Sequence, residues 1–200
     1  MSAAVSTDPR PGRDTVRQAA RGILPPWARV SAERRAHIER VVALLDEWAQ
    51  ALRLPEAERE RWRAAGWLHD ALRDAKPQEL SGCVPPEFQH FPPPLLHGPA
   101  AAELLGAELD EELCMAIRYH TTGHPELGRL GSALYLADFL EPGRDFEEEW
   151  RASLRARMPA QMQGVLREVI AARIKHLIES RKPIRSETAA FWSKVVAVGA

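Results

Sequence analysis

The sequence predicts an all-α fold, and three of its features support this prediction. Apolar residues recur at steps of three and four along most of the chain, which is the period of an amphipathic helix. Glycines, prolines and capping residues separate these stretches. No stretch shows the alternation of apolar and polar residues that is typical of a strand, and no internal repeat is found.

The first half of the chain is expected to hold a loose arm, two helices and a surface loop. Residues 1–25 are polar and rich in proline and glycine, which predicts an N-terminal arm with at most one short helical turn. Helical spacing of apolar residues begins at Ser31, and Pro55 suits the first turn of the next helix. Residues 76–96 contain three consecutive prolines, which cannot lie within a helix, so they are expected to form a loop.

The second half is expected to be helical with short connections. A short helix over 97–106 ends at Gly106, and Asp110 can cap a helix that runs to about His120. Ser186 could cap a last helix that ends near Val198. Between these lie two apolar-faced segments over 127–140 and 160–180, separated by a charged stretch over 145–157.

Composition excludes several classes of function. The chain has 200 residues, 27 basic and 28 acidic side chains and a net charge of −1, so bulk charge does not favour a nucleic-acid or membrane partner. No apolar run is long enough to span a membrane, and the N-terminus lacks a secretory signal. Cys83 and Cys114 form no CxxC pair. We therefore expect one cytoplasmic domain over 26–200, preceded by the flexible arm.

Several histidines and aspartates fall on helix faces that should be buried. His37 shares a face with Val41, His69 follows Trp62, His120 follows Ile117, and Asp138 follows Leu134 at helical spacing. A buried carboxylate needs a partner, and a metal ion is the usual partner where histidines and aspartates converge. His97 could join them. The alternative is that each is a satisfied core residue, with Asp138 paired to Arg144; spacing alone supports both interpretations equally.

The remaining histidines and the tryptophans are assigned to the surface and the core. His90 lies in the proline loop and His176 lies among charged residues, so both are expected at the surface. His124 is expected in solvent, with substrate contact as the alternative. Most tryptophans at helical spacing are core residues, and this is the expectation here. The alternative, a homodimer or base-stacking surface, concerns four tryptophans: Trp27, Trp62, Trp67 and Trp192.

Five motifs together carry a family resemblance that the His-Asp pair alone would not carry. They are RRAH at 34–37, WLHDALRDAK at 67–76, LLHGPAAAELLG at 95–106, IRYHTTGHP at 117–125 and LYLADFLEPGR at 134–144. The series resembles the HD-domain metal-dependent phosphohydrolases, and within them the YqeK-like symmetrical bis(5'-nucleosyl)-tetraphosphatases. The resemblance spans residues 31–192 and implies an HD-domain helical bundle.

The resemblance also implies a set of site residues. A first metal, iron or a similar transition metal such as manganese, would be held by His37, His69, Asp70 and Asp138. Beside Asp70, the catalytic residues would be His97 and His120, which either hold a second metal bridged by Asp70 or contact phosphate. Substrate phosphates would meet Arg34 and Arg144, and the turn lining the same pocket would be Thr121, Thr122 and Gly123.

One position departs from the family pattern. Relatives often have lysine where this chain has Arg73, and arginine can bind phosphate but cannot plausibly donate a proton. The implied reaction is hydrolysis of a dinucleoside polyphosphate by a metal-bound hydroxide, with diadenosine tetraphosphate giving two ADP. The alternatives are an HD phosphohydrolase for another nucleotide, such as a nucleoside monophosphate or a signalling nucleotide, a redox di-iron HD protein and a non-catalytic nucleotide-binding module.

Overall fold

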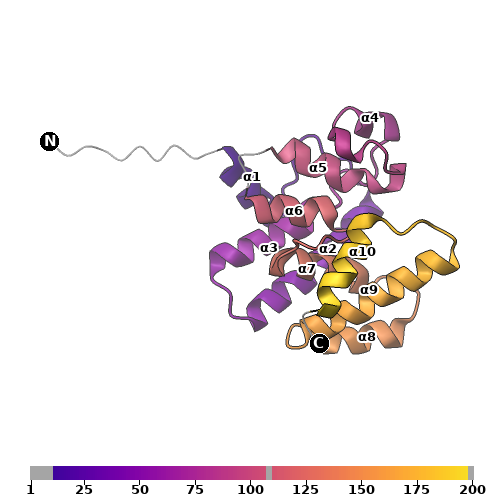
Figure 1. The fold of residues 1–200 in the computed structure, drawn as a ribbon. Helices are drawn as coiled ribbons and strands as arrows, with labels where there is room; N and C mark the ends of the chain where they lie inside the picture. The colour runs from indigo at the N-terminus through magenta and orange to yellow at the C-terminus, as the bar shows by residue number, and fades with distance from the viewer. Residues whose placement is uncertain (1–10, 107–109, 198–200) are drawn as a thin grey trace.

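The computed structural model describes residues 11–106 and 110–197, which form helices joined by loops, with no strand among them (Figure 1). The expectation of an all-α fold is therefore confirmed. The helices are α1 (Pro11–Ala20), α2 (Ala32–Ala51), α3 (Glu56–Leu68), α4 (Pro77–Ser81), α5 (His97–Leu105), α6 (Glu111–Tyr119), α7 (Arg129–Leu140), α8 (Glu148–Ala156), α9 (Met162–Glu179) and α10 (Ser186–Ala197).

Helix α7 lies at the centre of the molecule. It contacts α2, α3, α6, α8 and α9, and every residue from Leu130 to Asp138 is buried. The apolar core is built around this helix, and Trp48 and Trp62 are almost completely buried in it. Because α7 is surrounded on all sides, its last turn carries the carboxylate of Asp138 into the interior.

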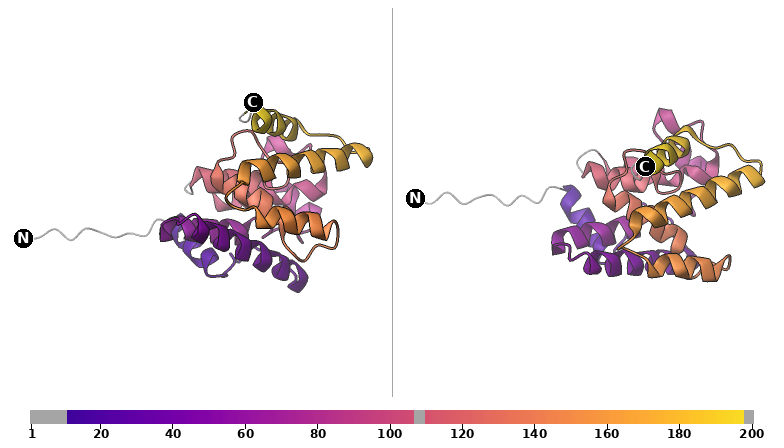
Figure 2. Two further views of the ribbon diagram at one scale, coloured as in Figure 1. Left: turned by 90° about the horizontal axis from the view of Figure 1, so that it is seen from below. Right: turned by 60° about the horizontal axis from the view of Figure 1, so that its bottom comes forward.

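Helices α9 and α10 pack against each other on the side of α7 away from α2 and α3. Figure 2 shows these two helices, in orange and yellow, separated from the purple α2 and α3 by the middle of the chain. Phe191 of α10 is buried and Ile174 of α9 is partly buried against the core. The arrangement places the C-terminal helices over the region where the ends of α5, α6 and α7 meet.

Local capping explains several helix starts. The side chain of Ser31 accepts a hydrogen bond from the backbone N–H of Arg34 at 3.2 Å, and α2 begins at Ala32, directly after Ser31. Asp110 accepts hydrogen bonds from the N–H groups of Glu112 and Leu113 at the start of α6. Pro55 directly precedes α3, as its fixed φ allows.

Two stretches differ from the sequence-based expectation. Residues 11–25 are not a loose arm, because α1 packs on α3 and Ala19 is completely buried there. Residues 1–10 lie outside the described residues, as does Val198, the expected end of α10. The proline loop contains α4 and two 3₁₀ turns, η1 (Pro86–Phe88) and η2 (Pro93–Leu95), since proline is tolerated in a first helical turn. Among the described helices, none is both long and apolar enough to cross a membrane.

Candidate metal centre and pocket

Six polar residues predicted from the sequence lie together where α2, α3, α5, α6 and α7 meet. Each is less than a tenth exposed to solvent. His37 projects from α2, and Asp138 from α7. The other four lie at helix ends or beside them: His69 and Asp70 after α3, His97 at the start of α5, and His120 after α6.

Asp70 links two groups of possible ligands. Its Oδ2 lies 3.6 Å from Nε2 of His37 and 3.6 Å from Nε2 of His69. Its Oδ1 lies 3.1 Å from Nε2 of His97 and 3.5 Å from Nε2 of His120. Each carboxylate oxygen therefore faces a different histidine pair, and both triads have the spacing of a metal site.

Asp138 extends the first group. Its Oδ1 lies 3.2 Å from Nε2 of His37 and accepts a hydrogen bond from Nη2 of Arg144 at 2.7 Å. Asp138 thus has the arginine partner expected of a core residue and also lies beside a histidine of the cluster. Pairing with Arg144 and a place in the histidine cluster therefore do not exclude each other for this residue.

The four imidazoles are oriented by their Nδ1 atoms. Carbonyl oxygens only accept hydrogen bonds, so Nδ1–H of His69 donates to Gly66 at 2.7 Å and that of His120 to Ile117 at 2.8 Å. His97 donates to the carbonyl of Pro94 at 3.1 Å. His37 lies with Nδ1 at 3.2 Å from the carboxylate of Glu141. All four rings consequently turn Nε2, the atom available to a metal, toward the centre.

The donor atoms fit a metal ion. Nε2 of His69 is buried and makes no hydrogen bond, and Nε2 of His37 is buried against the carboxylates of Asp70 and Asp138. Nε2 of His97 and Nε2 of His120 lie 3.0 Å apart. When both Nδ1 atoms carry the proton, two lone pairs face each other across this gap, and a cation relieves that repulsion. A set of imidazoles and carboxylates suits a divalent transition metal.

The protonation states also suit metal binding. Burial lowers the pKa of His69 to about 4 and lowers that of His97 as well. Burial would raise the pKa of Asp70, but the neighbouring histidines, His69 first, hold it well below its usual range. Burial would lower the pKa of His37, but its contacts with Asp138 and Glu141 raise it to about 9. Without an ion, positive charge on His37 therefore compensates the buried carboxylates.

Four of the six cluster residues line a pocket of about 900 Å³: Asp70, His97, His120 and Asp138. Arg34, Arg73 and Arg144 line it, as do Thr121 and Thr122. Nη1 of Arg34 donates to Oδ2 of Asp70 at 2.8 Å, so this guanidinium contacts the cluster and also lines the pocket. The predicted phosphate-binding arginines thus share one cavity with the cluster.

Helix α9 and the loop between α9 and α10 supply pocket residues that the sequence did not indicate. Arg173, Lys175 and Arg185 line the pocket, and so does His176, which we expected at the surface and which is also solvent-exposed. Nη2 of Arg173 donates to the carbonyl of Thr121 at 2.7 Å, which ties α9 to the turn after α6. Charged residues on a helix are usually solvated, so no local signal separates these from surface residues.

Two buried charged residues that support the cluster were also missed. Glu141 accepts a hydrogen bond from the N–H of Gly143 at 2.7 Å and pairs with Arg40 and His37. Burial would raise its pKa, but these contacts lower it to about 2. Arg151 is completely buried and donates to the carbonyls of Phe139, Glu141 and Arg144. Glu141 could have been noticed within the ADFLEPGR motif, whereas nothing in the sequence marks Arg151.

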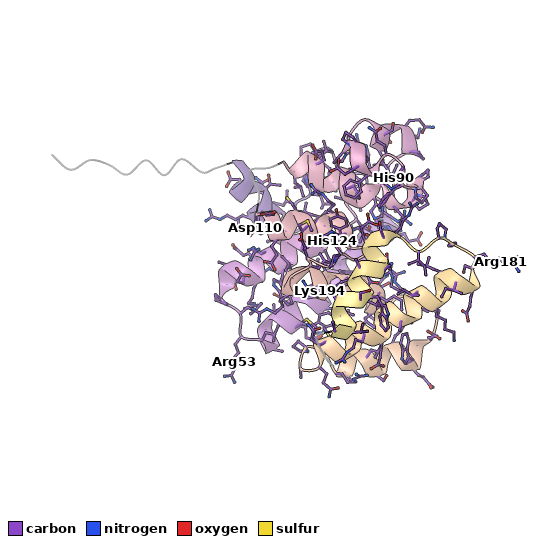
Figure 3. The ribbon with its side chains drawn as sticks, in the orientation of Figure 1. Arg53, His90, Asp110, His124, Arg181 and Lys194 are labelled. Atoms are coloured by element: carbon purple, nitrogen blue, oxygen red, sulfur yellow. The ribbon has the colours of Figure 1, made fainter. Side chains whose placement is uncertain are left out.

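Three of the remaining singled-out residues do not line the pocket. Gly123 has φ +72°, and a Cβ there would lie 2.2 Å from the ring of Phe191, so glycine allows the turn to pack on α10. His124, which is labelled in Figure 3, stacks on Tyr119 with ring centroids 4.3 Å apart. His90 is exposed, as expected, and packs edge-on against a phenylalanine of the proline loop.

A close approach of α5 and α6 brings His97 and His120 together. Gly98 follows His97, and a Cβ on it would lie 2.8 Å from the carbonyl oxygen of Ile117 and 3.2 Å from Cε1 of His120. No side chain larger than hydrogen fits between the helices at this point. The glycine of the LLHG motif therefore sets the spacing between two histidines of the cluster.

Comparisons with known proteins place this arrangement in a family. A model of the HD domain matches residues 34–144. A curated relative from Halalkalibacterium halodurans, named bis(5'-nucleosyl)-tetraphosphatase, symmetrical, is 23% identical over 79% of this chain and 88% of its own. A relative of the same name from Bacillus subtilis is 32% identical over 45% of this chain and 53% of its own. A crystal structure from Clostridium acetobutylicum, described as a predicted HD superfamily hydrolase involved in NAD metabolism, shares the fold, with a TM-score of 0.74, 22% identity and coverage of 93% of this chain and 97% of the other.

Proposed function

Because this chain belongs to the HD domain family, we propose that it is a metal-dependent phosphohydrolase that cleaves dinucleoside polyphosphates, cutting diadenosine tetraphosphate symmetrically into two ADP. The main support is the position of Asp70, which is shared between two histidine pairs at the base of an arginine-lined pocket. The names of the relatives from H. halodurans and B. subtilis support the choice of substrate.

In this proposal the cluster holds one or two ions of iron, with manganese or another divalent transition metal as the alternative. His37, His69, Asp70 and Asp138 would hold the first ion. His97 and His120 would hold a second ion together with Asp70, or would contact phosphate directly. When bound, such a metal would stabilise negative charge on phosphoryl oxygens and would lower the pKa of a bound water to about 7.

The protein's own residues would bind and orient the polyphosphate. Arg34 and Arg144 each already contact a carboxylate of the cluster, so a phosphate group entering there meets both guanidinium groups beside the ligands. Arg73 adds a third cation on the pocket wall, where its Nη1 donates to the carbonyl of Pro94 at 3.3 Å. These cations would offset charge that develops on the phosphoryl oxygens in the transition state.

Thr121 and Thr122 would complete the phosphate-binding side of the pocket. The hydroxyl of Thr121 lies 3.0 Å from Nε2 of His120 and donates to it when Nδ1 carries the proton. Gly123 would act by allowing the turn to adopt its backbone conformation. The proposal also includes a single domain that contains α1 as well as residues 26–197, a cytoplasmic location consistent with the free thiols of Cys83 and Cys114, and a homodimer as one assembly to be tested.

The direct test is product analysis. The purified protein is assayed for metal by elemental analysis and then offered diadenosine tetraphosphate with iron or manganese, and the nucleotides are separated by anion exchange. ADP alone supports the symmetrical cut. ATP together with AMP contradicts it, and hydrolysis of other nucleotides only would favour the broader HD phosphohydrolase alternative.

A substitution at the shared carboxylate tests the site. We expect Asp70→Asn to remove both metal retention and turnover, because the amide cannot supply a charged oxygen to either histidine pair. The matched control is Asp46→Asn, since Asp46 pairs with Arg59 and Arg63 outside the pocket. Retention of metal and activity in Asp70→Asn would show that the site is assigned wrongly.

A further inference from the structure

One wall of the pocket is aromatic, although the rest of its lining is largely charged. Phe139 from α7, Phe146 from the loop before α8 and Trp150 from α8 form this aromatic wall. The ring centroid of Phe139 lies 5.7 Å from that of Phe146 and 6.0 Å from that of Trp150, both in edge-to-face geometry. The three rings thus pack together, and all three residues line the pocket.

Phe146 presents apolar surface to the pocket. It is 40% exposed, and among the large apolar residues that the described part of the chain exposes, it alone lines the cavity. A ring that only stabilised the junction of α7 and α8 would be expected to turn inward, since burial is the favourable state. Exposure of a large ring inside a ligand pocket instead favours contact with an apolar part of the ligand.

The ring is held in position by a buried cation. The guanidinium of Arg151 lies 4.8 Å from the ring centroid of Phe146, and its Nη1 donates to the carbonyl of Arg144 at 2.9 Å. Arg144 in turn contacts Asp138 at the cluster. One buried side chain therefore fixes both the residue proposed to bind phosphate and the ring two positions further along the chain. A loop that presents a phosphate contact and an aromatic face together suits a nucleotide.

We propose that the aromatic wall, with Phe146 as its exposed face, binds the nucleobase of one half of the substrate by stacking. This inference rests on the proposed function for the choice of a nucleoside diphosphate as ligand. Stacking on an aromatic side chain is tolerant of base identity, because every base has a π-face. The subsite therefore distinguishes nucleotides from inorganic polyphosphates and leaves the cleavage position to the cluster.

Equilibrium binding measured by calorimetry separates the base from the phosphates. The ligands are ADP and inorganic pyrophosphate, and the protein is the purified full chain. Phe146→Leu keeps an apolar side chain for packing but removes the ring, so we expect ADP binding to weaken about tenfold, within the roughly 5- to 150-fold range that loss of one stacked base produces. Pyrophosphate binding should not change. Phe146→Tyr should restore ADP binding, since it keeps the ring.

The matched control is Leu104→Ala, because Leu104 is also 40% exposed but lies on α5 outside the pocket lining. It should leave both affinities unchanged. Equal weakening for ADP and pyrophosphate in Phe146→Leu, or no weakening for either, would overturn the inference. So would a wild-type protein that binds ADP no better than pyrophosphate. Selective loss of ADP binding in a protein that does not cleave diadenosine tetraphosphate would keep the base subsite and reject the proposed reaction.

Discussion

Replacing Gly98 with alanine should destabilise the protein, although alanine is normally the better helix former by about 1 kcal/mol. The added methyl carbon would lie 2.8 Å from the carbonyl oxygen of Ile117 and 3.1 Å from that of Arg118. Ordinary contacts between an aliphatic carbon and a carbonyl oxygen are about 3.3–3.6 Å. Helices α5 and α6 must therefore separate by about half an ångström, and both obstacles are backbone atoms, which cannot rotate away.

Overpacking of this kind costs about 1–3 kcal/mol, which exceeds the gain in helix propensity over most of that range. We expect a net loss of up to about 2 kcal/mol and, for a chain of this size, a fall in Tm of up to about 8 °C in thermal denaturation. The same separation moves His97 from His120, whose Nε2 atoms lie 3.0 Å apart, so activity should fall by at least about tenfold.

Gly82→Ala is the control, because a Cβ at Gly82 would meet nothing within 4 Å. That variant should be unchanged or more stable by about 0.4–1 kcal/mol, since alanine reduces the entropy of the unfolded chain. If Gly98→Ala has the same Tm as Gly82→Ala and retains full activity, the close approach of α5 and α6 does not constrain the cluster.

Three further outcomes are expected. Glu141→Gln should weaken metal affinity about 10- to 100-fold, as measured by chelator competition, because it removes the carboxylate that orients His37. The pKa of Glu141 is lowered from 4.5 to about 2, so above pH 4.5 the wild-type protein should have a larger free energy of unfolding in urea than Glu141→Gln. This difference should shrink as the pH falls toward 2, and a difference that does not change with pH would contradict the pairing of Glu141 with His37 and Arg40. Arg151→Met should lower the free energy of unfolding by about 2–4 kcal/mol, because it leaves several carbonyls of the α7–α8 connection without donors, and a smaller loss than 1 kcal/mol would count against this role. Treatment with a chelator should stop turnover and leave the helical circular dichroism signal in place, because the core around α7 is apolar; loss of helicity would mean that the fold requires the metal.

Fold prediction from the sequence succeeded where the determining interactions are local. Ser31 and Asp110 cap the helices that follow them, and Gly106 ends α5 with φ +80°. These signals act within a few residues and can be found without knowing the tertiary structure. The packing of α1 on α3 depends instead on a partner more than thirty residues away, so the same sequence was interpreted as a loose arm.

The candidate site shows the same division. His37, His69, His120 and Asp138 were identified because polar residues on apolar helix faces are anomalous, whereas Asp70 was assigned from the motif resemblance. His97 was added as a residue that could join them, and the structure brings all six together. Arg151 and Arg173 are arginines among other charged residues, and only the tertiary structure reveals that one is buried and the other faces the pocket. His176 was expected at the surface and is exposed there, and only its place in the pocket lining was missed.

The cluster and a large part of the pocket wall come from different parts of the chain, which has an evolutionary consequence. All six cluster residues lie within the stretch matched by the HD domain model, whereas α8, α9 and α10 follow it and supply part of the pocket wall. Among them, Arg151 of α8 also supports the cluster from outside the pocket lining. Substitutions of the pocket-lining residues in those three helices, with Arg151 kept, can change which molecules enter without altering the six cluster residues. Under the proposed function, exchange of residues 145–197 between relatives that share Arg151 therefore offers a route to altered substrate choice with an unchanged cluster.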